Sequence, residues 1–326
     1  LSDKIARFLE TAQERMADRR FVDDLVARYR MDEKSARFLI DFLRRQQQAT
    51  GGALPHRHHV LLEDMPLVGD GAGGRQVVIH TFWGGRVNRP FSLALAAAWE
   101  KHRGHAPSVI VTNDAIHLLL SQTDDLAGMM TWVSSPSVET LLKAQLEGSG
   151  VFGARFRECA ARALLLPRRG FNQRMPLWVT RQRSQRLLDA IGQFSDFPIL
   201  LETWRTCLKD DFDMPALARV LDELESGQIA WSIVRTQSPS PMARAGAWQV
   251  VNQFMYADDR QPGKVKRRTA GDLLDQVIFT PALRPVVDRA VVTRFQEKRQ
   301  RLHPGYAPDT PLELLEWVKE RILIPQ

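Results

Sequence analysis

Arginine is concentrated in one stretch of this 326-residue chain, residues 149–186. The stretch holds nine arginines, no lysine and a single acidic residue, Glu158, which gives it a local charge of +8. The whole chain carries a net charge of +7, so all its other residues together sum to −1. A guanidinium group is a planar fork that grips phosphate oxygens in pairs and stacks on bases. The sequence therefore predicts a polyanion site here, with a phosphodiester backbone as its ligand.

The candidate contacts of this site are the nine arginines and a neighbouring tryptophan. They are Arg155, Arg157, Arg162, Arg168, Arg169, Arg174, Trp178, Arg181, Arg183 and Arg186. We expect the arginines to hold phosphates. Trp178 either supports a base or anchors the core between two helices. A solvated basic face is the alternative for the whole stretch, although such faces usually mix both signs of charge.

Two helices joined by a basic loop must position these residues. Apolar residues at spacings of three and four predict a helix over residues 152–166, which Pro167 ends. Residues 168–174 then form a basic loop. A second helix opens at Pro176 and runs to Ile191, so that arginines from both helices face a common ligand.

A glycine-rich turn within residues 82–90 is a second candidate site. Its candidate residues are Gly84, Gly85, Arg86 and Asn88. Two glycines let a backbone approach another surface closely, and Pro90 suits the first turn of a helix over residues 90–102. The free N–H groups and positive dipole end of such a turn favour an anion. The alternative is a turn that is tight only because it packs against Trp83.

Five long strings carry a resemblance to a known family: HTFWGGRVNRPFSLALAAAWE, FGARFRECAARALLLPRR, PLWVTRQR, FPILLETWRTCLKDDFDMPAL and TQSPSPMARA. They resemble the region that follows the motor and winged-helix domains of large helicase-related (Lhr-type) proteins, often called the DEAD/H-associated region. The resemblance is strong over residues 75–256 and weaker in the flanking helices. It implies an accessory region of an ATP-dependent 3′-to-5′ DNA helicase that binds the translocated strand and serves DNA repair.

The same resemblance implies partners that this sequence does not itself contain. They are single-stranded DNA or a DNA/RNA hybrid, and RecA-like motor and winged-helix domains upstream in the parent protein. ATP and Mg²⁺ are expected for the parent helicase, whereas we expect no cofactor in this chain. The alternative is an interaction module whose basic helix pair docks the helicase motor, or another acidic protein surface, without touching nucleic acid.

No motif for ATP hydrolysis is found in the sequence. The glycines of residues 69–74 have P-loop spacing, but Arg75 and Gln76 stand where Lys and Ser/Thr are needed. No DEAD/DEAH setting, arginine finger or hydrolytic constellation replaces it, so we predict no catalytic residue and no ATPase activity of the isolated chain.

Metal, redox and membrane functions are also disfavoured. The cluster of residues 56–59 is not predicted to bind zinc, because Arg57 interrupts the histidines and no cysteine or carboxylate lies at ligand spacing. Cys159 and Cys207 lie on apolar helix faces and are predicted to be reduced core thiols. No apolar run approaches the roughly 18 residues that cross a bilayer, and the amphipathic start is unlike a signal peptide, so we expect a cytoplasmic protein.

Periodicity predicts an α+β fold that is mostly α. With 44% hydrophobic and 25% charged residues, the chain should bury a core and form two or three domains. The expected domains are an N-terminal helical module (residues 1–52), a small β-β-α-β-β sheet domain (residues 53–132) and a helical bundle domain (residues 133–326) that one strand, residues 229–235, interrupts. Asp32 and Ser240 are the expected helix caps.

Overall fold

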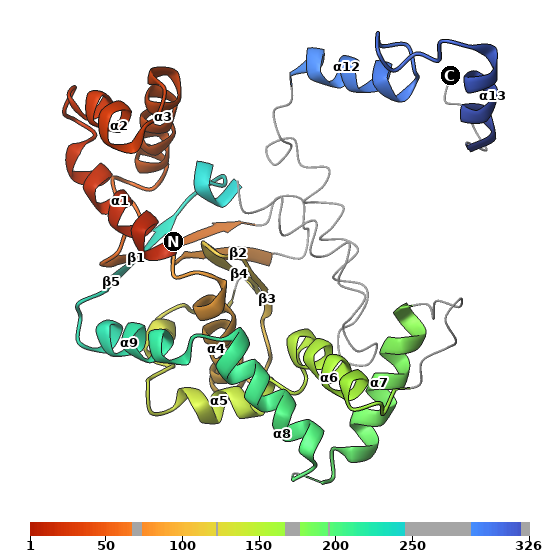
Figure 1. The fold of residues 1–326 in the computed structure, drawn as a ribbon. Coiled ribbons are helices and arrows are strands. Elements are labelled where there is room, and N and C mark those ends of the chain that lie inside the picture. The colour runs from red at the N-terminus through yellow and green to blue at the C-terminus, as the bar shows by residue number, and fades with distance from the viewer. Residues whose placement is uncertain (67–73, 122, 167–176, 195, 245–287, 321–326) are drawn as a thin grey trace. The chain divides into compact units, whose positions relative to one another are not determined.

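The computed structural model describes residues 1–66, 74–121, 123–166, 177–194, 196–244 and 288–320. They belong to two compact units, residues 1–283 and residues 284–326. The first unit combines one sheet with many helices (Figure 1), which confirms the α+β, mostly α prediction. The described part of the second unit holds α12 (Arg289–Arg299) and α13 (Pro311–Glu320).

The sheet has five strands in the order β3-β4-β2-β1-β5. The strands are β1 (His59–Pro66), β2 (Gly74–His80), β3 (Ser108–Val111), β4 (Ala115–Ser121) and β5 (Ala230–Arg235). The predicted β-β-α-β-β unit is present, with β1, β2, β4 and β3 paired antiparallel. It is extended by β5, which pairs with β1 in parallel and comes from residues that we had assigned to the helical bundle domain.

The two faces of the sheet differ in character. Because side chains alternate along a strand, Leu62 and Ile79 lie on the face covered by α4 (Gly85–Arg103), where they join one buried apolar core with Trp99. α5 (Val138–Gln145) and α9 (Met214–Glu225) pack on α4 and complete this layer.

The opposite face of the sheet carries a buried polar network around Glu63. The Glu63 carboxylate accepts hydrogen bonds from His80 Nε2 at 3.1 Å and from Thr236 Oγ1 at 3.1 Å. It also accepts from Ser240, through the backbone N–H at 2.7 Å and through Oγ at 2.6 Å. Ser240 Oγ in turn accepts from the backbone N–H of Ala243 at 3.3 Å, as expected for a cap. The network therefore fastens the segment after β5 to the sheet.

The helix α4 begins earlier than predicted and contains Pro90. We had placed Pro90 in the first helical turn, but the helix starts at Gly85, so that prediction was wrong. Proline lacks an N–H and leaves the carbonyl four residues earlier without its helical partner. That carbonyl, of Arg86, accepts instead from the backbone N–H of Asp213 at 3.0 Å. The bond compensates for the proline and ties α4 to the start of α9.

Three helices form the N-terminal module: α1 (Ser2–Arg15), α2 (Phe21–Tyr29) and α3 (Glu33–Ala49). They enclose their own apolar core, which includes Phe21, Leu25 and Leu43. Asp32 caps α3 by accepting from the backbone N–H of Ser35 at 2.9 Å, which confirms the predicted cap. Leu54 and Met242 extend this core towards the sheet, so the module does not bury its apolar surface alone.

A further helical layer carries the arginine-rich stretch. It consists of α6 (Gly150–Arg162), α7 (Leu177–Ile191), α8 (Pro198–Arg205) and a π-helical turn, η2 (Thr206–Asp211). Phe152, Phe156 and Phe212 are buried between these elements. Cys159 and Cys207 are both buried and unbridged, and burial raises the pKa of the Cys207 thiol to about 12. Both are therefore free thiols in the core, as predicted.

Candidate nucleic-acid interface

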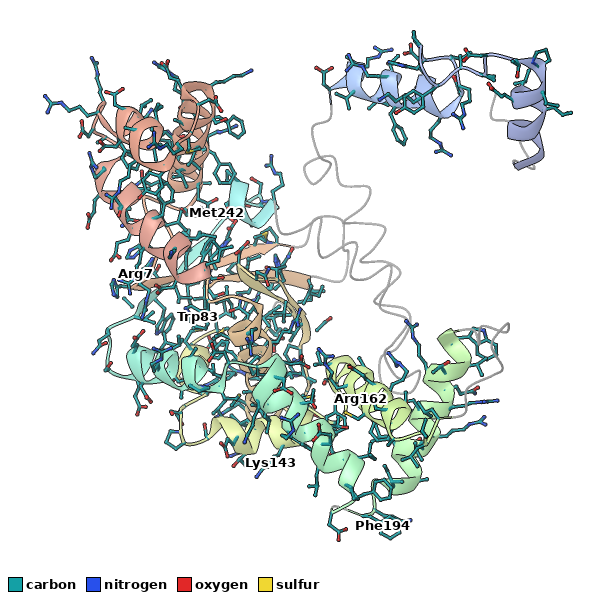
Figure 2. The ribbon with its side chains drawn as sticks, in the orientation of Figure 1. Arg7, Trp83, Lys143, Arg162, Phe194 and Met242 are labelled. Atoms are coloured by element: carbon teal, nitrogen blue, oxygen red, sulfur yellow. The ribbon has the colours of Figure 1, made fainter. Side chains whose placement is uncertain are left out.

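The helix α6 turns its apolar side to the core and its arginines outward. Ser149 caps the helix by accepting from the backbone N–H of Phe152 at 3.2 Å. Phe152 and Phe156, one helical turn apart, are fully buried. Arg155, Arg157 and Arg162 are left to the other sides of the helix, and Arg162 is labelled there in Figure 2.

Arg155 is already occupied by carboxylates of the same protein. Its Nε and Nη2 donate to the two carboxylate oxygens of Asp211, each at 2.6 Å, and its Nη1 donates to Glu158 at 2.6 Å. These bonds raise the pKa of the Arg155 guanidinium. A bidentate pair of this kind braces α6 against η2. Arg155 thus has a structural role, and the carboxylates of Asp211 and Glu158 already neutralise its charge.

Other arginines of the same layer have no such partners. Arg183 and Arg186 are exposed on α7 and make no hydrogen bond or ion pair with described residues. Arg157, half-buried on α6, likewise has no such bond within the described part of the chain. Arg162 is exposed and donates to Cys159 Sγ at 3.3 Å, a weak acceptor. Arg181 is half-buried on α7 and interacts within the protein.

Trp178 lies in the first turn of α7, and 66% of it is exposed to solvent. A tryptophan that anchors a core buries most of its large surface. The exposure contradicts the core-anchor interpretation that we had left open for this residue. Its ring is therefore available for stacking, on a helix that also carries the exposed Arg183 and Arg186. Arg168, Arg169 and Arg174, the remaining predicted contacts, lie outside the described residues.

The glycine turn is shaped by close packing. Gly84 has φ 88° and ψ 153°, a conformation that is essentially restricted to glycine. A Cβ atom on Gly84 would lie 2.9 Å from Ser2 Oγ, and one on Gly85 would lie 2.6 Å from Asn113 Oδ1. The turn therefore packs closely against α1 and the β3–β4 turn, and a side chain at either glycine would displace Ser2 or Asn113.

Asn88 and Arg86 serve this turn in different ways. Asn88 is fully buried; its amide donates to the carbonyls of Thr112 and Asn113 at 3.0 Å each, and it accepts from Thr81 Oγ1 at 2.8 Å. All of its hydrogen-bonding groups hold the turn, so its role is structural. Arg86 is exposed and donates to the carbonyl of Asp210 at 2.8 Å. Of the predicted residues in this turn, Arg86 alone presents a charge to solvent.

A pocket of about 370 Å³ borders the turn, and sequence reasoning missed it. Arg57 lines the pocket and pairs with two acidic residues that also line it. Its Nε lies 3.1 Å from Asp3 Oδ1, and its Nη2 lies 2.7 Å from Glu223 Oε2. The lining residues come from α1, the turn before β1, the glycine turn and α9; they include Arg7, Arg57, Trp83, Val87, Arg219 and Glu223 (Figure 2 labels Arg7 and Trp83). Since no two of these elements are adjacent in sequence, no local pattern signals the pocket.

The fold and this surface define an α+β module in which a mixed five-stranded sheet supports a helical layer with an exposed tryptophan and unpaired arginines. No helix in the described part is long and apolar enough to cross a membrane. The sequence model of the DEAD/H associated family matches residues 54–243, more than half of the chain. The chain belongs to the DEAD/H associated family.

Curated relatives extend the similarity beyond these residues. The chain is 33% identical over 312 residues to the Lhr helicase/uracil glycosylase of Escherichia coli (strain K12), covering 94% of this chain and 20% of that protein. It is 35% identical over 276 residues to the Lhr helicase/probable uracil glycosylase of Mycolicibacterium smegmatis, covering 82% of this chain and 18% of that protein. The chain thus spans about a fifth of the length of these relatives.

A solved structure is similar as well. The structure of Mycobacterium smegmatis helicase Lhr bound to ssDNA and AMP-PNP matches with a TM-score of 0.68 and 32% sequence identity, covering 75% of this chain and 31% of that one. Together with the curated relatives, this match confirms the resemblance to the DEAD/H-associated region of Lhr-type proteins.

Proposed function

We propose that this chain is the nucleic-acid-engaging region of an Lhr-type ATP-dependent helicase with 3′-to-5′ polarity. In this proposal it holds the translocated single strand through arginine–phosphate contacts. The observation that carries the proposal is the exposure of Trp178 on a helix that also carries Arg183 and Arg186, two exposed arginines with no hydrogen bond or ion pair among the described residues. The relative that was solved with ssDNA bound supports it.

The proposed contacts lie on two helices that pack together, α6 and α7, and we name this set of residues the α6–α7 surface. It consists of Arg157, Arg162, Trp178, Arg183 and Arg186. Guanidinium groups without carboxylate partners are free to neutralise phosphates, and each such contact releases a condensed counterion. A base stacked on an aromatic ring contributes about 1–3 kcal/mol without regard to sequence. The surface thereby combines backbone attraction with stacking, which suits a strand that must slide.

The parent activity belongs to the longer protein in this proposal. RecA-like motor and winged-helix domains would supply ATP and Mg²⁺ binding, and single-stranded DNA or a DNA/RNA hybrid would be the substrate, with a cytoplasmic role in DNA repair. The relatives support this by their similarity over most of this chain. The chain itself would grip the strand and contribute no catalytic group.

A salt-dependent titration tests the proposal. Binding of a fluorescent single-stranded oligonucleotide to the full chain is measured by anisotropy over a series of salt concentrations. The log–log slope should be about −0.7 for each phosphate neutralised. The double variant Arg183→Ala with Arg186→Ala should bind more weakly and flatten the slope by roughly 1.4 if both contact phosphate.

A matched control separates local contact from bulk charge. The double variant Arg37→Ala with Arg45→Ala also removes two positive charges, but from the exposed side of α3. It should leave the salt dependence of binding unchanged. Equal slopes for the α7 double variant and the parent chain, with the fold intact, would refute the strand contact. That result would favour the alternative module, in which the basic helices dock an acidic protein surface.

A further inference from the structure

Two histidines of the turn before β1 lie beside a carboxylate of α1. His58 Nδ1 is 2.6 Å from Glu10 Oε1, and His56 Nδ1 is 3.8 Å from the same oxygen. Each of the three groups offers one ligand atom, and these atoms all lie within 4.8 Å of one another. Within the described residues, this is the one group of three or more His, Cys, Asp and Glu side chains that meets such a spacing.

The fold removes both sequence-based objections to a metal here. Arg57 stands between the histidines in sequence, but its side chain forms ion pairs with Asp3 and Glu223 and is not directed at Glu10. The missing carboxylate arrives from α1: the backbone N–H of Arg57 donates to the carbonyl of Ala6 at 3.2 Å. Glu10 lies one helical turn beyond Ala6, so this bond sets it next to the histidines.

The turn that carries the histidines is held by its own hydrogen bonds. The backbone N–H of His56 donates to the carbonyl of His59 at 3.0 Å, and the N–H of His59 donates to the carbonyl of His56 at 3.1 Å. The ring of His59 is already committed, with Nδ1 3.1 Å from the carbonyl of Leu54 and Nε2 2.9 Å from Ser232 Oγ. Two imidazoles and one carboxylate therefore remain for a ligand.

We propose that Glu10, His56 and His58 bind one divalent transition-metal ion, with zinc as the best fit, and that the ion fastens α1 to the start of β1. Imidazole nitrogen and carboxylate oxygen are ligands that zinc prefers. Two histidines and one carboxylate leave a fourth position, which an open pocket of about 480 Å³ beside His56 and His58 exposes to water.

The distances fit a small adjustment of exposed side chains. Ligand atoms that surround zinc tetrahedrally at 2.0–2.1 Å lie about 3.3 Å from one another. The 3.8 Å separation of His56 and Glu10 needs little change, and the 2.6 Å separation of His58 and Glu10 lengthens by about 0.7 Å when the metal replaces their hydrogen bond. The His58 side chain is 49% exposed and has room to move.

His56 already accepts one hydrogen bond within the turn. The backbone N–H of His58 donates to His56 Nδ1 at 3.3 Å, and this long hydrogen bond is the interaction that a metal displaces.

Zinc binding by the full chain tests the site directly. Zn²⁺ is titrated into the protein in competition with a chromophoric chelator, and one ion per chain is expected. Glu10→Gln and His58→Ala should each weaken the affinity by at least about tenfold, because ligand loss costs no less than the loss of a supporting partner. His105→Ala is the matched control, since His105 is another exposed histidine, 3.4 Å from the Asp124 carboxylate, and should bind zinc like the parent.

Thermal melting gives a second readout that does not depend on the chelator. Only the folded chain brings Glu10 to the histidines, so saturating Zn²⁺ should raise the melting temperature of the parent and of His105→Ala, but not of Glu10→Gln. Circular dichroism checks that each variant is folded. Absence of saturable zinc binding by the parent, or equal affinities for the parent, Glu10→Gln and His58→Ala, overturns the site.

Discussion

Acidification should destabilise this protein through one buried histidine, His117. It lies on β4 between β3 and β2 and is fully buried. Gln76 Nε2 is 3.2 Å from its Nδ1, and its Nε2 has no hydrogen-bond partner among the described residues. Burial, reinforced by the nearby His80, lowers the pKa of His117 to about 3. The folded protein thus keeps this imidazole neutral.

The sign and size of the effect follow from linkage. An unfolded histidine has a pKa of about 6.5, so the unfolded chain binds a proton that the folded chain refuses between about pH 6.5 and pH 3. Stability is complete above that window and falls as the pH drops through it. The slope approaches about 1.4 kcal/mol for each pH unit, and the full shift corresponds to roughly 5 kcal/mol.

Urea unfolding at pH 7, 6 and 5 measures this slope. His117→Gln, which does not titrate, should lose most of the decline in unfolding free energy that the parent shows, whereas the exposed His102→Gln should keep it. The ionisation of Glu63 affects the unfolding free energy only at lower pH. Burial pulls its pKa upward, but hydrogen bonds from His80 and Ser240 and the charge of His80 lower it overall, so its contribution is lost below about pH 4.5. An equal slope for the parent and His117→Gln between pH 7 and pH 5 would refute this reasoning.

Four further predictions follow from the geometry. Trp178→Ala should cost about 1–3 kcal/mol in single-strand binding with little change in salt slope or melting temperature, while Trp178→Phe is mild; a drop in melting temperature alone would point to packing. Gly84→Ala should destabilise the fold by about 1–3 kcal/mol, whereas Gly153→Ala, with open space around it in α6, should be neutral or stabilising by calorimetry. Arg155→Ala should lower the melting temperature more than Arg186→Ala, because it leaves Asp211 without its bidentate partner. The pure chain should hydrolyse no ATP with or without DNA, and DNA-stimulated phosphate release would contradict this.

Local chemistry was predictable from the sequence. The cap at Asp32 depends on an interaction a few positions apart, and the structure has it. The helix α6 was also expected, since its buried face repeats every three or four residues. Its predicted end was wrong: α6 stops at Arg162, and Leu164 adopts a left-handed backbone conformation (φ 60°), so the helix ends before Pro167 is reached.

Long-range placement was not predictable. The strand β5 has the pattern of any short strand, and nothing in it signals a parallel partner so far back in the chain. The ion pair between Arg155 and Asp211 joins positions 56 apart in the sequence. No local pattern signals it, so we had predicted that Arg155 contacts phosphate. Glu10 lies beside the two histidines only in the folded chain. In the sequence it is more than 40 residues away from them, so no metal-binding motif with a short ligand spacing includes it.

The joining of β5 to β1 has a consequence for synthesis on the ribosome. Glu63 and Thr236, which the network links, are 173 positions apart. At roughly 5–20 residues per second, β1 emerges roughly 9 to 35 s before its outer neighbour exists. During that interval its free edge exposes unpaired N–H and C=O groups, which invite pairing with other chains. The large separation of β1 and β5 in the sequence therefore leaves this side of β1 open to such pairing until β5 has been synthesised.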